Sequence, residues 1–472
     1  MANSQSNREA NAFPPDVLVA LDRGRPRSLR AQLEAQLRRA IQTGRFAPGQ
    51  KLPPSRTLAA DLGVSRNVVV EAYAHLAADG YLAARQGSAT EVAANGSSER
   101  HRGRSAEHKP AAIARFFGGL PDPALFPRAE WQRHYRAVLH GLPDASLGYP
   151  GPSGALALRD ALCSYLSRVR GVISAPEDLL ITSGFTQALA LIVRALKARG
   201  IDAIAVEDPC FGFHREGISV AGLRPVPIPV DEDGLQVDRL AQAQVSAVLL
   251  SPAHSYPSGA VLSPPRRSAL VAWARARDAL IVEDDYDAEF RYDRAPVGAL
   301  QGLAPEHVLY AGCASKTLSP ALRLGWVAAP PHLRDELVRE KVFNDMGGAL
   351  LEQLAFARFL EGGGFARHLR RVRPVYRRRR DAVIEALSAH AGAARATGAA
   401  AGLHLFVRLP DGCDEQALLE RAKAGGVLVE PAAWHFADSA NAPPALVLGY
   451  GALGEAAIRR GIEILGAAIS SI

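Results

Sequence analysis

Two stretches, residues 310–326, YAGCASKTLSPALRLGW, and residues 281–290, IVEDDYDAEF, decide the fold of this chain. Each opens on apolar residues typical of a buried strand and carries polar side chains where that strand ends. Further apolar runs of this kind alternate with amphipathic helical stretches along the chain. The alternation predicts an α/β fold with a mostly parallel sheet covered on both faces. The predicted strands cover residues 178–182, 201–206, 245–251, 279–285, 307–312 and 323–330.

One lysine stands out because of its position behind a predicted strand. Lys316 follows the run 307–312, so we expect it at the carboxyl edge of the sheet, where parallel sheets bind ligands. A lysine that forms a Schiff base needs burial or cationic neighbours to free its amine. Arg323 is placed to supply positive charge and to hold a phosphate. Taken alone, a lysine at a strand end is more often a solvated surface group.

Three consecutive carboxylates, Glu283, Asp284 and Asp285, end the strand 279–285 and are followed by Tyr286. Carboxylates buried at such a place need a cationic or protonated partner. The pyridinium nitrogen of pyridoxal phosphate is such a partner, and enzymes of that cofactor use an aspartate in this role. A surface turn and a magnesium site built from the three carboxylates are the alternatives.

Two other strand ends carry groups that suit a planar phosphorylated ligand. Residues 179–193 read as strand, glycine turn and helix, and the helix start offers backbone N–H groups and the hydroxyls of Ser183 and Thr186 to a phosphate. Phe211 lies just past the strand 201–206, where an aromatic ring can pack on a planar ligand. Phe211 by itself would be assigned to the core.

The first part of the chain has a different pattern, which predicts a helix-turn-helix with a wing. Residues 28–42 place apolar side chains at a spacing of four, as in a helix. Ser55 and Ser65 are predicted to cap two further helices, the second running to about Asp79, with a turn at Gly63 between them. Residues 81–92 then read as strand, tight turn and strand.

Side chains at the start of the second of these helices suit DNA. Ser65, Arg66 and Asn67 would be exposed there, where base edges and phosphates are read, and Arg56 and Arg85 add positive charge. A three-helix protein-interaction module with solvated arginines is the alternative.

Composition bounds the class of protein. The 472 residues are 48% hydrophobic with a net charge of +7, which excludes a disordered chain and a small disulfide scaffold. The four cysteines form no CxxC pair, so we expect reduced thiols and no metal site. No apolar stretch suggests a signal peptide or a membrane span, which favours a cytoplasmic protein without membrane contact.

Changes in composition divide the chain into three parts. We predict a DNA-binding domain at residues 13–92, a flexible linker at 93–114 and an α/β domain at 115–472, with a small α+β subdomain from about 365 to 472. Residues 367–383 carry eight arginines. We favour a solvated helix face, interrupted at Pro374, over a second surface for DNA or phosphate.

The motifs together resemble a known family of regulators. Residues 39–92 resemble the winged helix of the GntR transcriptional regulators, and the chain from about Gly118 onward resembles the aspartate-aminotransferase fold, fold type I of the pyridoxal phosphate proteins. The whole chain is similar to the MocR/GabR family, most closely at AHSYPSG (253–259), EDDYDAEFRY and SKTLSPALRLGW. The resemblance implies a homodimer, a double-stranded DNA operator and a small-molecule effector.

The resemblance also implies roles for individual residues. Lys316 would carry pyridoxal 5'-phosphate as the internal aldimine, Asp284 would pair with the ring nitrogen, and Tyr286 would bond the ring hydroxyl. Phe211 would stack on the ring, and Tyr149 would reach the phosphate of a neighbouring subunit. The other cofactor contacts implied are Arg323, Ser315, Phe185 and Thr186 at the phosphate, with His254 and Tyr256 near the ring. The DNA contacts implied are Arg56, Arg66, Asn67, Gln86 and Gly87.

Two departures from the family bear on function. Val447 stands where aminotransferases keep the arginine that grips the substrate carboxylate, and Phe213 stands where the GABA-responsive member has an arginine. A guanidinium clamp contributes much of amino-acid recognition. We therefore expect a regulator that senses a B6 vitamer or an amine with another acid group such as a sulfonate. An active aminotransferase with an autoregulatory DNA-binding head and a cofactor-free scaffold are the alternatives.

Overall fold

The computed structural model describes residues 19–24, 27–83, 90–93, 112–293 and 297–471. The chain divides into two compact units, residues 1–109 and 110–472, which we describe separately. No helix among the described residues is long and apolar enough to cross a membrane.

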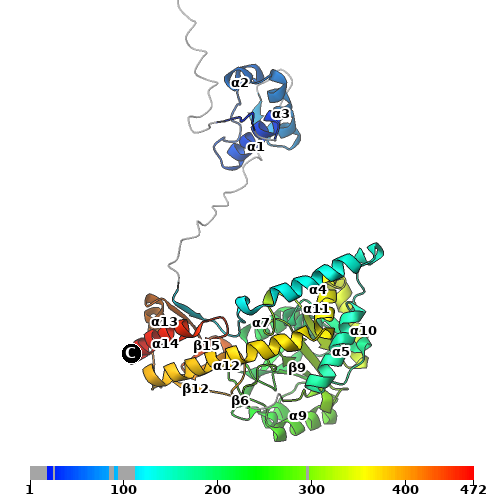
Figure 1. The fold of residues 1–472 in the computed structure, drawn as a ribbon, viewed down its shortest axis with the longest axis vertical. Coiled ribbons are helices and arrows are strands. Elements are labelled where there is room, and N and C mark those ends of the chain that lie inside the picture. Colours follow the sequence, from blue (N-terminus) through cyan, green and yellow to red (C-terminus); the bar gives the residue numbers. More distant parts are fainter. Residues whose placement is uncertain (1–18, 25–26, 84–89, 94–111, 294–296, 472) are drawn as a thin grey trace, which may run out of the picture. The chain divides into compact units, whose positions relative to one another are not determined.

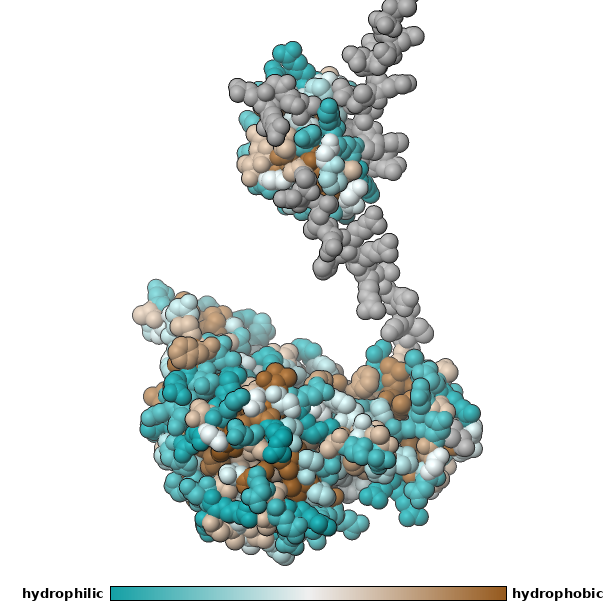
Figure 2. All heavy atoms as spheres, turned by 180° about the vertical axis from the view of Figure 1, so that it is seen from behind, coloured by the Kyte–Doolittle hydropathy of each residue, from teal (hydrophilic) through white to brown (hydrophobic). Residues whose placement is uncertain are grey.

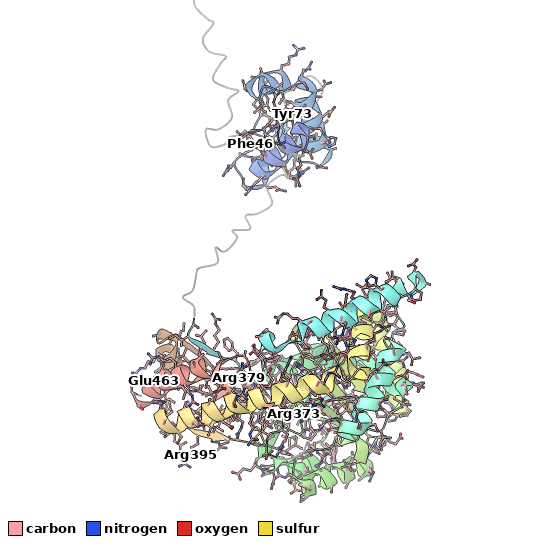
Figure 3. The ribbon with its side chains drawn as sticks, in the orientation of Figure 1. Phe46, Tyr73, Arg373, Arg379, Arg395 and Glu463 are labelled. Carbon is pink, nitrogen blue, oxygen red and sulfur yellow. The ribbon has the colours of Figure 1, made fainter. Side chains whose placement is uncertain are left out.

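The first unit is a small helical body closed by a strand pair (Figure 1). Its core holds Leu33, Leu37, Val69 and Leu76, all buried, with Phe46 and Tyr73 lying inside the unit (Figure 3). The strands pair antiparallel, as a wing requires, whereas the predicted turn between them lies outside the described residues. The elements are α1 (Leu29–Gln42), α2 (Ser55–Asp61), α3 (Arg66–Ala78), β1 (Leu82–Ala83) and β2 (Glu91–Val92).

The second unit is built on an eight-stranded sheet of order β4-β11-β10-β9-β8-β5-β6-β7. The strands β10, β9, β8, β5 and β6 run parallel, while β11 is antiparallel to both its neighbours. The sheet is thus mostly parallel, as the sequence predicted. The strands are β4 (Leu179–Thr182), β5 (Ala203–Asp208), β6 (Arg224–Asp231), β7 (Gly234–Leu235), β8 (Ala247–Leu250), β9 (Leu280–Asp285), β10 (Val308–Cys313) and β11 (Gly325–Ala328).

Helices cover both faces of this sheet, because successive side chains of each strand point to opposite sides. Val282 and Leu309 belong to a core with α6, α7 and α10, whereas Ile281 and Val308 belong to a core with α8 and α9. Helices α5 and α11 pack against the second face near β4 and β11, and α4 packs against α11. The helices are α4 (Arg128–Gly141), α5 (Leu156–Arg170), α6 (Phe185–Ala198), α7 (Gly212–Ala221), α8 (Val237–Gln242), α9 (Pro264–Arg277), α10 (Pro331–Asp345) and α11 (Leu350–Glu361).

A smaller α+β region completes the unit. Its sheet has the order β12-β13-β15-β14-β3, so the strand that begins the unit closes the edge of a sheet formed by the end of the chain. That first strand was not predicted. The elements are β3 (Ala114–Phe116), α12 (Gly364–His390), β12 (Arg395–Thr397), β13 (His404–Arg408), α13 (Glu415–Ala424), β14 (Val427–Pro431), β15 (Ala445–Gly449) and α14 (Glu455–Ser470).

The arginine-rich run 367–383 lies within α12, which continues through Pro374 rather than breaking there as predicted (Figure 1). Several of its arginines bind groups of the same unit. Arg367 pairs with Glu130 at 2.6 Å, and Arg379 pairs with Asp122 at 2.7 Å (Figure 3). These contacts fasten α12 to the segments around α4, so part of the run serves packing within the unit.

Candidate cofactor and effector site

Lys316 lies in the turn that follows β10, at the carboxyl end of the parallel strands. The side chain is half-buried, and its amine faces the loop after β3. A Cβ atom placed on Gly119 would lie 3.1 Å from Lys316 Nζ. Since Gly119 also has a positive φ of 67°, glycine is needed there both for the backbone and for the space beside the amine.

The three carboxylates at the end of β9 point to opposite faces of the sheet. Glu283 accepts hydrogen bonds from the backbone N–H groups of Leu300 and Gln301, at 2.9 and 3.0 Å. Asp284 shares the face of the sheet that α6 and α7 cover, since it alternates with Glu283 along the strand. The carboxylates therefore do not converge, and the magnesium site built from all three is not supported.

Asp285 is engaged through its Oδ2 atom on the far face, while its Oδ1 atom has no hydrogen-bond partner among the described residues. It pairs with Arg170 Nε at 2.7 Å and accepts a hydrogen bond from Tyr310 Oη at 2.6 Å. Arg170 and Asp285 are both buried, and an ion pair at this depth holds only if both partners stay in place. The pair fixes the register of the strand end that presents Asp284 to the other face.

Asp284 differs from Asp285 in its charge partner: Asp285 keeps one unpaired oxygen but is paired with Arg170, whereas Asp284 forms no ion pair with any described residue. Its Oδ1 atom is buried and has no hydrogen-bond partner among the described residues. Burial raises the pKa of Asp284 well above its ordinary value, and the negative charges of Asp285, Asp287 and Glu207 raise it further, while the charge of Lys316 opposes them. A cationic ring nitrogen on this face would satisfy the free oxygen.

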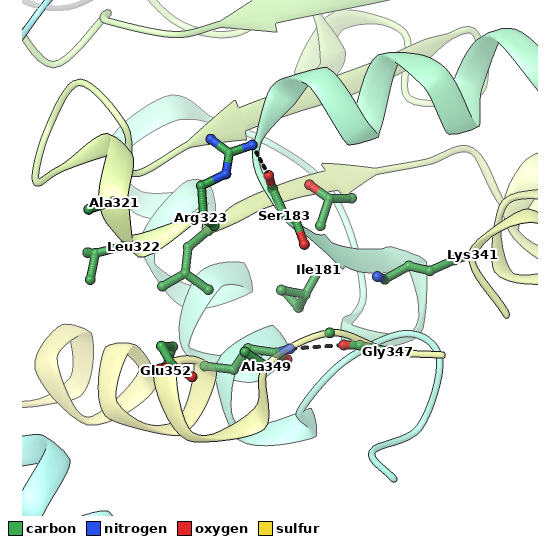
Figure 4. Close-up of a pocket in the computed structure, with 13 residues that line it drawn as sticks. Ile181, Ser183, Ala321, Leu322, Arg323, Lys341, Gly347, Ala349 and Glu352 are labelled. Carbon is green, nitrogen blue, oxygen red and sulfur yellow. Dashed lines mark hydrogen bonds between the residues drawn. The ribbon is translucent and has the colours of Figure 1, made fainter. Parts of the chain in front are cut away.

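A cradle for an anion lies beside Lys316. Gly184, with a φ of 91°, is the N-cap of α6, whose first residues are Phe185 and Thr186. Helix N-termini attract phosphate. The guanidinium of Arg323 donates a hydrogen bond to the backbone oxygen of Ser183 (Figure 4), and a Cβ atom on Gly184 would lie 3.0 Å from Arg323 Nη2. The glycine thus leaves room for the arginine at the helix start.

A cavity of about 240 Å³ adjoins Arg323 and Ser183 (Figure 4). Lys341 reaches its wall, but its amine is already paired with Asp345 Oδ1 at 2.6 Å. Ser315, which directly precedes Lys316, hydrogen-bonds Cys313 and opposes the burial that raises the pKa of that thiol. The structure thus places Arg323 against Ser183 and Gly184 at the start of α6, and Ser315 directly before Lys316 in the turn after β10.

Aromatic and imidazole rings form the rest of the surroundings. Phe211 lies at the start of α7 and meets Tyr256 edge to face, with ring centroids 5.4 Å apart. Tyr286 Oη lies 3.1 Å from His254 Nδ1, and that nitrogen lies 2.9 Å from Asp287 Oδ2. The five cofactor-site predictions on β9, α7 and the loop 253–259 thus fall in one cluster.

His254 and Asp287 also lie close to His404, with the possible ligand atoms of the three within 4.8 Å of one another. Sequence spacing does not indicate this grouping, because His404 lies far along the chain on β13. The backbone at Gly402 closes the space beside them, since a Cβ atom there would lie 2.3 Å from His254 Cε1. The two histidines and the aspartate pack as a polar layer under Tyr286.

Tyr149 lies apart from this cluster in the single chain. It is 85% exposed and belongs to a set of exposed apolar side chains that also includes Phe343, which is 86% exposed. Apolar side chains also interrupt the hydrophilic surface of the larger unit (Figure 2). Exposed apolar side chains in such numbers are typical of surfaces that another protein covers.

In the N-terminal unit, α2, a short turn and α3 have the predicted arrangement. Arg56, Arg66 and Asn67 are exposed, and Arg66 Nε lies 3.5 Å from Ser55 Oγ. Ser65 is the N-cap of α3, but its side chain makes no cap hydrogen bond. The prediction for Ser55 was wrong by one position, because Pro54 is the N-cap of α2. Arg85, Gln86 and Gly87 lie outside the described residues.

Comparison with known proteins accounts for both units. Residues 29–92 match the family model described as bacterial regulatory proteins, gntR family, and residues 128–431 match aminotransferase class I and II. The chain is 32% identical over 480 residues to the probable rhizopine catabolism regulatory protein MocR of Rhizobium meliloti, and the match covers 96% of each chain. The chain belongs to the MocR-type transcriptional regulators.

Other relatives agree with this placement of the MocR-type chain. It is 34% identical over 377 residues to the HTH-type pyridoxine biosynthesis transcriptional regulator PdxR of Corynebacterium glutamicum, covering 79% of this chain and 82% of the relative. The kynurenine aminotransferase of Pyrococcus horikoshii, solved in complex with PMP, superposes with a TM-score of 0.70 at 28% identity, covering 76% of this chain and 91% of that one. The larger unit is thus an aminotransferase fold.

Sequence reasoning missed several residues around the MocR-type site. Glu430 lies at the end of β14, and Trp434 and His435 follow it in a short turn that packs against Phe211. Residues 427–436, VLVEPAAWHF, read as a strand and a turn with an isolated carboxylate and imidazole. Nothing in that pattern points to a site, because the segment reaches Lys316 only through tertiary packing.

The unpartnered carboxylate of Asp284 leads to a prediction for the cofactor-free protein. We expect the free energy of unfolding to fall less with rising pH in Asp284→Asn than in the wild type. The pKa of Asp284 is raised in the folded state, so the folded protein keeps a proton on this carboxyl at pH values where the unfolded chain, with a pKa of about 3.9, has released it. That contribution is complete at acid pH and is lost as pH rises through the raised pKa. Urea denaturation of the larger unit at several pH values measures it.

Burial also raises the pKa of Glu207 and Glu283 to about 7, with the same sign, so only the difference between wild type and variant reports Asp284. Asp160→Asn, at an exposed aspartate of α5, is the matched control and should leave the pH profile unchanged. A variant at position 284 whose stability falls as steeply as that of the wild type would contradict the assignment.

Proposed function

We propose that this MocR-type chain is a transcriptional regulator that binds pyridoxal phosphate at Lys316 and responds to a small amine at the same site. One observation carries the proposal: Asp284 Oδ1 is buried without a hydrogen-bond partner among the described residues, on the face of the sheet that α6 covers and within reach of the charge of Lys316. The relatives named as transcriptional regulators support the role of the N-terminal unit.

The residues present fit the cofactor, and each has a physical role toward it. Pyridoxal phosphate supplies a carbonyl carbon that an amine can attack and a ring that draws electrons from it. The amine of Lys316 would hold that carbon, and Asp284 would keep a proton on the ring nitrogen. Phe211 would pack on the ring, and Tyr286, beside His254 and Tyr256, would bond the ring hydroxyl.

The phosphate would lie at the helix start. Arg323 would neutralise its charge while Ser315 and the backbone at Phe185 and Thr186 donate hydrogen bonds. Tyr149 would complete the phosphate site of a second subunit, which the exposure of its ring allows. The exposed apolar side chains near it support a homodimer, and a two-fold dimer would bind paired half-sites on double-stranded DNA.

Control of transcription requires that a ligand bind differently to two arrangements of the protein. We assign DNA binding to residues 13–92, linkage to the segment between residue 92 and β3, and ligand sensing to the larger unit. The predicted linker boundary at residue 114 was too late, because β3 begins at Ala114. Ser65, Arg66 and Asn67 at the start of α3 would read the operator, with Arg56, Arg85, Gln86 and Gly87 around them. A ligand that exchanges with Lys316 would shift the balance between the two arrangements.

An active aminotransferase with an autoregulatory head is the second candidate. The chain is 31% identical over 359 residues to aromatic-amino-acid aminotransferase 1 of Thermococcus litoralis, which favours it. Val447, which is buried and apolar where the carboxylate-binding arginine is expected, counts against it. Steady turnover of an amino donor and a keto acid acceptor would decide for the enzyme.

The cofactor assignment is tested by Lys316→Ala. We expect the wild type to show the visible absorption of a lysine-bound pyridoxal phosphate and the variant to lose it, because the proposal assigns the bond with the cofactor to this amine. Lys341→Ala, at the other lysine near Arg323, should keep the absorption. Equal absorption in wild type and Lys316→Ala would refute the assignment.

The DNA assignment is tested by Arg66→Ala. We expect binding to a selected operator fragment to weaken by about 1–3 kcal/mol if Arg66 reads a base. Arg39→Ala, at an exposed arginine in the last turn of α1, is the control for lost positive charge. Titrations at one fixed salt concentration measure both. Operator affinity equal to that of the wild type would show that α3 is not the reading helix.

A further inference from the structure

The side of the site that would receive the effector carries Val447 where aminotransferases have an arginine, and it carries the carboxylate of Glu430 beside that position. Glu430 on β14 lies directly opposite Val447 on β15 in the antiparallel register. Residues opposite each other in such a pair share a face of the sheet. Val447 is fully buried in a cluster with Phe406, against which Tyr256 packs. Where an aminotransferase would present a guanidinium, this sheet presents a methyl-lined wall with a carboxylate beside it.

Glu430 is held in place and ionised. Its Oε2 accepts a hydrogen bond from the backbone N–H of Gly118 at 3.1 Å, and its Oε1 lies 3.3 Å from His435 Nε2. His435 Nδ1 accepts the backbone N–H of Gly212, so the ring proton is on Nε2 and faces the carboxylate. Burial alone would raise the pKa of Glu430, but the neighbouring His435 ring, the Gly118 hydrogen bond and the charge of Lys316 lower it below its ordinary value.

The carboxylate lies close to the reactive amine. The backbone N–H of Gly118 donates a hydrogen bond to Glu430. The next residue, Gly119, flanks the amine, because a Cβ atom placed on it would lie 3.1 Å from Lys316 Nζ. Adjacent Cα atoms are about 3.8 Å apart, so one dipeptide bridges the two groups. A short ligand can therefore reach both.

Aromatic rings line the space around Glu430. Phe213, which is 60% exposed, meets Trp434 edge to face at 4.7 Å, and Trp434 meets Phe211 at 5.9 Å. Tyr256 meets His435 at 5.1 Å. Aromatic faces attract ammonium groups, and they also pack against a hydrocarbon chain.

The arginine nearest this space is already engaged. Arg215 on α7 donates hydrogen bonds to the backbone oxygens of Trp434, His435 and Phe436, two of them at 2.8 Å. Its guanidinium thus fastens the aromatic turn and is not free to grip a carboxylate. Arg323 is engaged at the start of α6.

We propose that the effector is a short diamine without a carboxylate, with one amine at the Lys316 centre and its second ammonium paired with Glu430. This inference rests on the proposed function, because it takes the cofactor to be bound at Lys316. In the exchange, the ligand amine would form a C=N bond to the cofactor carbon as the C=N bond to Lys316 breaks. The two hydrogens of the ligand amine would pass to Lys316 Nζ, which becomes a free amine, and no oxidant or reductant is needed. A sulfonate or carboxylate effector would instead meet the charge of Glu430.

Three amines of one chain length test the proposal on the full-length protein loaded with pyridoxal phosphate. Putrescine, n-butylamine and γ-aminobutyrate each have four carbons and differ only at the fourth carbon from the reacting amine. That carbon bears an ammonium in putrescine, is a methyl in n-butylamine and is a carboxylate in γ-aminobutyrate. The change in visible absorption on titration gives an affinity without any turnover. We expect putrescine to bind about tenfold more tightly than n-butylamine, and γ-aminobutyrate to bind most weakly.

Glu430→Gln keeps the shape of the side chain and removes its charge. We expect it to lower the affinity for putrescine by about tenfold and to leave that for n-butylamine unchanged, which also shows that the variant is folded. Glu415→Gln is the matched control, because Glu415 is a half-buried carboxylate of the same region that accepts a backbone N–H, from Ala445 at 3.1 Å. It should not change the order of the three amines.

The outcomes separate this inference from the function on which it rests. A loaded protein that binds γ-aminobutyrate as tightly as putrescine, or a Glu430→Gln variant that keeps the putrescine preference, overturns the diamine assignment and leaves the cofactor assignment standing. A protein that takes up no pyridoxal phosphate overturns the proposed function and the diamine assignment with it.

Discussion

A buried carboxylate oxygen without a partner is costly, and the end of β9 holds one at Asp284. Its two neighbours lie on the opposite face, where backbone N–H groups bond both oxygens of Glu283 and Arg170 neutralises Asp285, although one oxygen of Asp285 also has no hydrogen-bond partner among the described residues. The alternation of a strand thus leaves a single charge demand on the face that carries Lys316. The fold is stable around that demand only if a proton or a cation meets it.

Much of this could be predicted from local sequence. Most buried strands of the large sheet are recognisable in the sequence as apolar runs. The polar groups that follow β9 and β10 lie at the same edge of the sheet because parallel strands end there. Strand β6 was missed because its sequence, RPVPIPVD, has three prolines between its alternating β-branched residues, and proline argues against a strand. Helix α12 continues through Pro374 because the turns before and after the proline are packed, with Val372 and Tyr376 buried. The rule that proline interrupts a helix considers only local sequence and does not include such packing.

The effector side of the site was the least predictable part. Gly118 and Glu430, which share a hydrogen bond, are 312 positions apart, and they meet because β3 and β14 pair in parallel at the edge of the small sheet. The sequence did show the loss of the arginine at Val447. It did not show that Glu430 lies opposite Val447, because the register of the two strands is set by the packing of the whole sheet. The chain thus shares the aminotransferase fold but differs from the expected aminotransferase pattern at Val447.

The ring nitrogen itself offers the most direct test. If Asp284 faces it, the nitrogen of bound, ¹⁵N-labelled pyridoxal phosphate should be protonated throughout the neutral pH range, because the buried carboxylate stabilises the cation. Its ¹⁵N chemical shift should then be that of a pyridinium in the wild type and move toward that of a neutral pyridine in Asp284→Asn. A neutral pyridine shift in the wild type, unchanged by the substitution, would contradict the account.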